Sequence, residues 1–177
     1  MKNHLDTTFI RIQNKPKTSS HLGFRRMTDT FLYQQVIGFN CVFCHLPVSS
    51  DPIFSGVNNR NHCPYCLTSR HVDLFKAGDR MSACKAPMQA IGLAWKKTRN
   101  KYGFKRGELM IVHQCDDCYQ ISINRIASDD DLDKLNVLFI KTITMDYTMM
   151  EEIRRLGIDL LKNKDEREFI ESIFGIN

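Results

Sequence analysis

The chain has 177 residues, of which 42% are hydrophobic and 25% are charged, and its formal net charge is +5. This composition is typical of one globular domain with extensions, and the length is too short for two large domains. The sequence contains no run of about 18 apolar residues, so no membrane-spanning helix is expected. Its N-terminus also lacks the apolar segment of a secretory signal. We therefore expect a cytoplasmic protein with no membrane partner.

Charge is unevenly distributed along the chain. Residues 1–40 carry 6 basic and 2 acidic side chains, residues 41–127 carry 12 and 6, and residues 128–177 carry 7 and 12. The first two segments therefore present a basic surface, which is what phosphate binding requires, whereas the last segment is acidic.

Composition and periodicity divide the chain into three parts. Residues 1–36 are polar and basic without apolar periodicity, which predicts an N-terminal basic arm. Residues 37–128 contain all seven cysteines between strand-like runs, which predicts a metal-stabilised β core similar to a zinc ribbon. Residues 129–177 have apolar residues at helical spacing and predict a C-terminal helical extension. The expected fold class is therefore small α+β.

Individual elements can be predicted within these parts. Residues 31–44 form an apolar run that predicts a strand leading into a cysteine turn. Residues 108–127 predict a strand, a second cysteine turn and a further strand in which apolar and polar side chains alternate. Helical spacing of apolar residues predicts helices over residues 129–145, 146–162 and 164–174.

The cysteines are the most informative feature of the sequence. Six of the seven form Cys-x-x-Cys pairs at positions 41/44, 63/66 and 115/118, and Cys84 stands alone. A Cys-x-x-Cys turn presents two thiolates to one ion, and two such turns complete a tetrahedral structural zinc site. An odd number of cysteines disfavours a disulfide framework, and a redox centre needs one reactive cysteine rather than three pairs. The pattern therefore predicts two structural zinc ions.

The spacing allows two divisions of the ligands between these ions. In the first, one site consists of Cys41, Cys44, Cys63 and Cys66. The other three cysteines, Cys84, Cys115 and Cys118, then need a fourth ligand, either His71 or His113. In the second, one site consists of Cys41, Cys44, Cys115 and Cys118, and the other of Cys63, Cys66, His71 and Cys84. We favour the second, because two apolar strands that each end in a cysteine turn resemble the two halves of one ribbon.

An ordered series of short motifs runs through residues 39–131. It consists of RNHCPYCLTSRHVD at 60–73, AGDR at 77–80, HQCDDC at 113–118 and NRIASDD at 124–130. This series resembles the RNHCP domain family, and the resemblance implies a small bacterial zinc-binding protein without implying a reaction. His45 and Tyr119 follow the outer cysteine pairs where this family commonly has glycine, so strain in a left-handed turn is expected there.

A basic and aromatic segment spans residues 95–106. Lysine and arginine neutralise phosphates, and aromatic rings stack on unpaired bases. With two arginines of the basic arm, this segment supplies the predicted RNA contacts: Arg25, Arg26, Trp95, Lys96, Lys97, Arg99, Lys101, Tyr102, Lys105 and Arg106. The alternative for this segment is a solvated loop whose aromatic residues anchor it to the core.

These features predict a structural zinc protein that binds RNA, with rRNA and ribosomal proteins as partners in a ribosome component or associated factor. The alternative is a zinc-stabilised adaptor that contacts a partner protein through the acidic C-terminal helices. No enzymatic activity is expected. The sequence has no phosphate loop and no HExxH motif, and it lacks the His-x-Glu of zinc deaminases.

Overall fold

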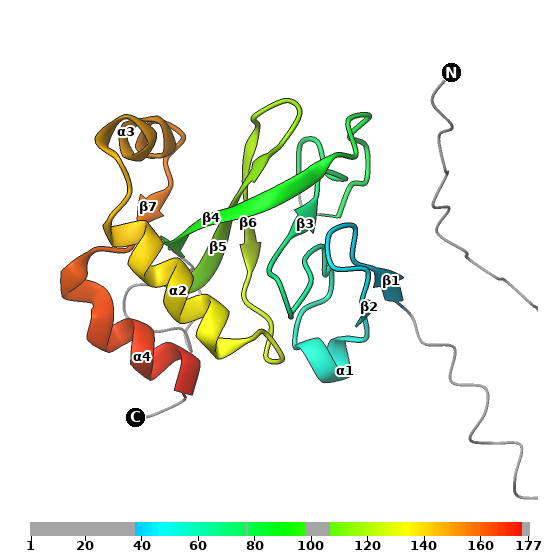
Figure 1. The fold of residues 1–177 in the computed structure, drawn as a ribbon, viewed down its shortest axis with the longest axis horizontal. Helices are drawn as coiled ribbons and strands as arrows, with labels where there is room; N and C mark the ends of the chain where they lie inside the picture. The colour runs from blue at the N-terminus through cyan, green and yellow to red at the C-terminus, as the bar shows by residue number, and fades with distance from the viewer. Residues whose placement is uncertain (1–37, 77, 98–106, 175–177) are drawn as a thin grey trace, which may run out of the picture.

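A curled antiparallel sheet lies at the centre of the fold, with the C-terminal helices at one end and cysteine-rich turns at the other (Figure 1). The computed structural model describes residues 38–76, 78–97 and 107–174. These ranges confirm the predicted α+β class, and none of their helices is long and apolar enough to cross a membrane. The predicted basic arm, residues 1–36, lies outside them.

The large sheet is built around one long strand. Its members are β3 (Ser69–Arg70), β4 (Pro87–Lys96), β5 (Glu108–Cys115), β6 (Ile121–Arg125) and β7 (Asp159–Leu160). β4 pairs with β5 along one edge, and along the other edge it pairs first with β3 and then with β7. Met88, near the start of β4, is in register with both Ser69 and Cys115. This strand therefore holds β3 beside the cysteine turn that follows β5.

The part of the predicted first strand that the structure describes belongs to a different sheet. β1 (Gly38–Asn40) pairs only with β2 (Pro47–Ser49) in a separate hairpin, which is followed by the single helical turn α1 (Pro52–Ser55). Within the described ranges, no strand pairing connects this hairpin to the large sheet.

Helices follow in the predicted order, and each is shorter than predicted, α3 most of all. They are α2 (Leu132–Ile143), α3 (Tyr147–Arg155), the 3-10 turn η1 (Asn163–Asp165) and α4 (Glu166–Phe174). The carboxylates of Asp131 and Asp146 cap α2 and α3 by accepting the backbone N–H of the third residue of each helix. α3 ends well before residue 162, because Gly157 adopts a left-handed φ of 77° and the chain then enters β7.

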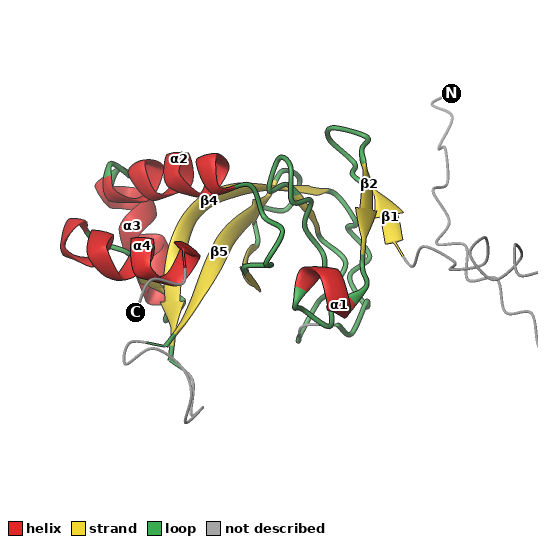
Figure 2. Cartoon of the chain, turned by 90° about the horizontal axis from the view of Figure 1, so that it is seen from below, coloured by secondary structure: helices red, strands yellow, loops and turns green. Residues whose placement is uncertain are grey.

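The main hydrophobic core lies between the sheet and helices α2 and α4, and α2 lies along β4 (Figure 2). A smaller core on the opposite face of β4 and β5 packs against α3. Gly92 allows α2 to approach β4 closely, because a Cβ at this position would lie 3.2 Å from the Thr142 hydroxyl oxygen. That hydroxyl accepts the backbone N–H of Leu93 at 2.8 Å and donates to the carbonyl of Leu138 at 2.6 Å. The N–H of Leu93 is directed to the edge of β4 away from β5, where its carbonyl accepts the N–H of Leu161, and a buried hydroxyl thus attaches the helix to this edge.

Thr142→Val should destabilise the metal-loaded protein by about 1–3 kcal/mol, because the buried N–H of Leu93 would lose its acceptor. Urea denaturation followed by circular dichroism measures the change. Thr144→Val is the matched control, since the Thr144 hydroxyl bonds only to exposed carbonyls at the end of its own helix. Equal destabilisation by the two substitutions would contradict the role given to Thr142.

Candidate metal centres

The three Cys-x-x-Cys turns share one backbone geometry. In the first turn, the N–H of Cys41 donates to the carbonyl of Leu46 at 2.9 Å, and its carbonyl accepts the N–H of His45 at 3.1 Å. The turns that begin at Cys63 and Cys115 repeat both bonds. In each turn, the residue after the second cysteine is left-handed, with φ values of 61°, 60° and 60° at His45, Leu67 and Tyr119. The left-handed turns expected at His45 and Tyr119 are therefore present, and each holds a side chain.

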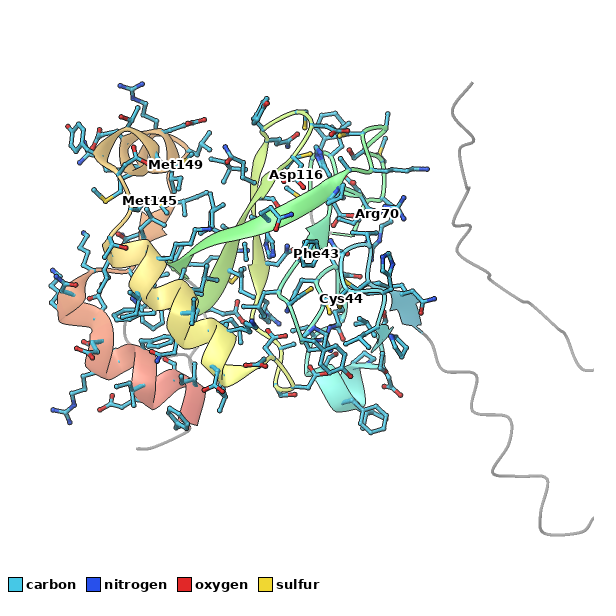
Figure 3. The ribbon with its side chains drawn as sticks, in the orientation of Figure 1. Phe43, Cys44, Arg70, Asp116, Met145 and Met149 are labelled. Carbon is cyan, nitrogen blue, oxygen red and sulfur yellow. The ribbon has the colours of Figure 1, made fainter. Side chains whose placement is uncertain are left out.

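The first two turns form one candidate site, which we call site 1. Its ligand atoms lie within 4.8 Å of one another and belong to Cys41, Cys44, Cys63 and Cys66. The Sγ atoms of Cys41 and Cys66 are 3.5 Å apart, and those of Cys44 and Cys63 are 3.6 Å apart. Tetrahedral zinc with Zn–S bonds of about 2.3 Å requires sulfur separations of about 3.8 Å, so the four thiols fit one such ion. Cys44 lies at the end of the molecule away from Met145 and Met149 (Figure 3).

The third turn contributes to a second candidate site, site 2. Its ligand atoms also lie within 4.8 Å of one another and belong to His71, Cys84, Cys115 and Cys118. The Cys84 and Cys115 sulfurs are 3.6 Å apart, and Nδ1 of His71 is 3.3 Å from the Cys118 sulfur. Backbone bonds between His71 and both Lys85 and Ala86 bring the histidine beside Cys84.

The ligand pairing that the sequence favoured is therefore wrong, and the first alternative, with His71 as eighth ligand, is the one formed. Both outer cysteine turns do follow strands, but β1 and β5 belong to different sheets. The turn at 115–118 instead lies beside the segment from β3 to β4, because β4 pairs with both β3 and β5. The predicted set of eight ligands is unchanged, and only its division differs.

His113, the other candidate for eighth ligand, lies in the protein core. Its Nε2 is 2.7 Å from the carbonyl of Leu67 and its Nδ1 is 3.0 Å from the side-chain nitrogen of Asn124. A neutral imidazole has one donor and one acceptor, so both ring nitrogens are fully used in these bonds. Burial, together with repulsion from His62, lowers the pKa of His113 to about 3 and keeps the ring neutral.

Each site has the four ligand groups that a closed metal centre requires. Burial raises the pKa of the Cys41 and Cys63 thiols, so an incoming metal ion must displace protons from them. The backbone N–H groups of Phe43 and Cys44 lie 3.4 and 3.5 Å from the Cys41 sulfur and stabilise its thiolate form. Four protein ligands leave no open position for a water molecule, so neither site is suited to activating one.

A buried ionic network fixes the turn at Cys63 to the start of the C-terminal helices. The guanidinium of Arg60, whose side chain is fully buried, donates to Asp129 at 2.7 Å and to Asp130 at 3.2 Å. Nε2 of His62 donates to the buried Asp130 carboxylate at 2.9 Å, and the backbone N–H of Ala127 donates to the same group at 2.8 Å. The arginine and histidine of the RNHCP sequence are therefore structural partners of the aspartates that precede α2.

The asparagine of the same sequence motif organises the loop after β3. Its side chain donates to Asp73 at 2.9 Å and accepts a bond from the guanidinium of Arg80. Within this loop, the carboxylate of Asp79 accepts the backbone N–H groups of Leu74, Phe75, Lys76 and Met81. These bonds hold the pKa of Asp79 well below its usual range.

The predicted RNA contacts are only partly described by the structure. Trp95 is not available for base stacking, because it lies on β4 with 6% of its surface exposed and packs in the core. This prediction was wrong, since the alternation of the strand turns the ring inward. Lys96 and Lys97 are exposed as expected. The remaining predicted contacts lie outside the described residues: Arg25, Arg26, Arg99, Lys101, Tyr102, Lys105 and Arg106.

Comparison with known proteins gives one match. The RNHCP domain matches residues 37–136, which include all eight candidate ligands and the buried ionic network. No curated protein and no solved structure matches the chain.

Paired cysteine substitutions should report which thiols share an ion. Cys44→Ser with Cys63→Ser removes two ligands from site 1 alone, so about one metal ion per chain should remain. Cys44→Ser with Cys115→Ser removes one ligand from each site and should weaken both. Native mass spectrometry of the two purified variants measures the stoichiometry. Loss of both ions from the first variant, with one retained by the second, would restore the other pairing.

Asp130→Asn should destabilise the metal-loaded protein by about 3–5 kcal/mol, because it leaves the buried guanidinium of Arg60 without one of its two carboxylates. Asp133→Asn is the matched control, since Asp133 is exposed in the first turn of α2. Loss of the Asp133 charge should lower the free energy of unfolding by less than about 1 kcal/mol. Urea denaturation measures both values, and a similar small effect for both would refute a structural role for the network.

Proposed function

The chain belongs to the RNHCP domain family, and we propose that it is a structural zinc protein that binds RNA. In this proposal it acts as a component of the ribosome or as a factor associated with it. The exposed lysines that form no ion pair within the described ranges are the observation that favours RNA.

Zinc is the ion that best suits the two ligand sets. Four thiolates, or three thiolates with one imidazole, are the usual ligands of structural zinc, and oxygen-preferring ions such as magnesium or calcium would not select them. The sulfur separations of about 3.5 Å within site 1 agree with a single tetrahedral ion. Each ion would stabilise turns that have few apolar contacts of their own.

RNA binding is supported by exposed lysines at both ends of β4, beside the metal sites and at the opposite end of the strand. Four exposed lysines form no ion pair within the described ranges: Lys76, Lys85, Lys96 and Lys97. In the loop after β3, Asp73 and Asp79 are occupied by backbone N–H groups of that loop and by Arg80, whereas Asp116 and Asp117 are exposed in the turn of site 2. The lysine charges are therefore available to phosphates.

The ribosomal assignment rests on analogy. Zinc ribbons with basic loops commonly serve as rigid RNA-binding elements in ribosomes and in the transcription machinery, and fold alone does not determine function. The chain's positive net charge and the acidic C-terminal segment are compatible with contacts to both rRNA and ribosomal proteins.

Sucrose-gradient sedimentation of lysate at low and high salt tests the assignment. The wild-type protein should comigrate with a ribosomal subunit. Lys96→Glu with Lys97→Glu should weaken this binding. It should also reduce the slope of log RNA affinity against log salt concentration by about one to two. Lys134→Glu with Lys164→Glu is the control, because these exposed lysines lie outside the basic segment of residues 95–106. Wild-type protein found only in RNA-free fractions at low salt would refute the proposal.

The adaptor function remains the second candidate because α2 has an exposed apolar face. Val137 and Ile140 are three residues apart on this helix and are 65% and 51% exposed. If the protein is an adaptor, Val137→Lys with Ile140→Lys should abolish association with its partner protein, while reversal of Lys96 and Lys97 should have little effect.

A further inference from the structure

A polar pocket of about 190 Å³ lies between β3, the loop that follows it, and β6. This volume is below the roughly 300–1,000 Å³ of sites for drug-sized ligands, so the occupant must be small, on the scale of one nucleobase. Arg70, which lines the pocket, lies at the end of the sheet opposite Met145 and Met149 (Figure 3). The pocket thus belongs to the half of the molecule that holds the metal sites.

One wall of the pocket offers hydrogen-bonding groups in a fixed arrangement. Ser122 and Asn124 line it from β6, and their spacing of two residues places both on the same face of the strand. Asn124 is held in place because its side-chain nitrogen bonds to Nδ1 of His113 at 3.0 Å. Hydroxyl and amide groups can both donate and accept, which suits the mixed donors and acceptors on the edge of a base.

The mouth of the pocket combines an aromatic ring with positive charge. Phe75 lines the pocket although it is 80% exposed, and Lys76 and Arg70 lie beside it. The ring is exposed on a fixed loop, because the backbone N–H groups of Phe75 and Lys76 both donate to Asp79 at 2.9 and 3.0 Å. An exposed aromatic on an ordered loop is a suitable stacking surface for an unpaired base.

Two other lining residues are compatible with an occupant that carries phosphate. The carboxylate of Asp73 accepts bonds from the side chain of Asn61 and the N–H of Gly78, and it pairs with Arg80. Its negative charge is thereby offset. Nε2 of His71 is buried without a hydrogen-bond partner in the part of the chain that the structure describes. An acceptor that reached it from the pocket, directly or through water, would satisfy this atom.

We propose that this pocket binds one unpaired nucleotide of an RNA strand. The base enters the pocket against Phe75 and bonds to Ser122 and Asn124, and the adjacent phosphates lie near Arg70 and Lys76. The inference rests on the proposed RNA-binding function and adds to it the place where a single base is held.

The test uses the full-length, metal-loaded protein and a short fluorescein-labelled single-stranded RNA of mixed sequence. Phe75→Ala should weaken binding in an anisotropy titration by about five-fold or more, as expected for the loss of one stacked base. Phe54→Ala is the control, because Phe54 is 66% exposed on α1 and does not line the pocket. Photo-crosslinking with 4-thiouridine RNA should label the peptide that contains residues 70–76.

The possible outcomes separate the pocket from RNA binding in general. If the wild-type protein binds the RNA but Phe75→Ala and Phe54→Ala bind it equally well, the pocket proposal fails and the RNA-binding proposal stands. If the wild-type protein does not bind RNA at low salt, both proposals fail. Competition by uridine or adenosine monophosphate as strong as that by the unlabelled RNA would overturn the proposal in favour of a free nucleotide.

Discussion

The contact between Arg60 and Asp130 connects the cysteine turn at residues 63–66 to the segment that precedes α2. Both side chains of this ion pair are fully buried. Asp130 also accepts a hydrogen bond from Nε2 of His62, the residue that precedes Cys63. A buried charge with all its bonds satisfied is tolerated only in a single arrangement, because any displacement leaves a charge unpaired. The position of the turn at Cys63 is therefore fixed relative to the segment before α2. This also fixes the orientation of the metal sites relative to the C-terminal helices.

β4 continues this connection on the other side of the molecule. Its first residues lie between β3 and the end of β5, beside site 2, and its last residues pack under α2 and pair with β7. Trp95 and Leu93 on this strand belong to the same core as Phe139 of α2. The two metal sites thus do not stand alone as flexible fingers. They are attached to a sheet with its own hydrophobic core, which gives the basic surface a stable shape.

The sequence predicts the local features better than the long-range ones. Cys-x-x-Cys spacing identifies the turns, and alternation identifies β6, because both depend on neighbouring residues. The division of ligands depends instead on which strands pair, and nothing in the apolar run before Cys41 reveals that β1 joins a separate hairpin. Trp95 was misassigned for a related reason. An aromatic residue next to lysines is typical of a nucleic-acid contact. The sequence does not reveal that Trp95 lies on the inward face of a strand.

The left-handed residues after the three cysteine pairs should make the stability of the protein in the cell depend on its metal ions. A non-glycine residue held in this region stores about 1–3 kcal/mol, and His45, Leu67 and Tyr119 all have this conformation. Loss of an ion would let the strained turns open and expose their backbone to proteases. If the ions are zinc, the abundance of the protein should then follow the zinc supply of its host, because newly made chains that fail to acquire the metal would be degraded.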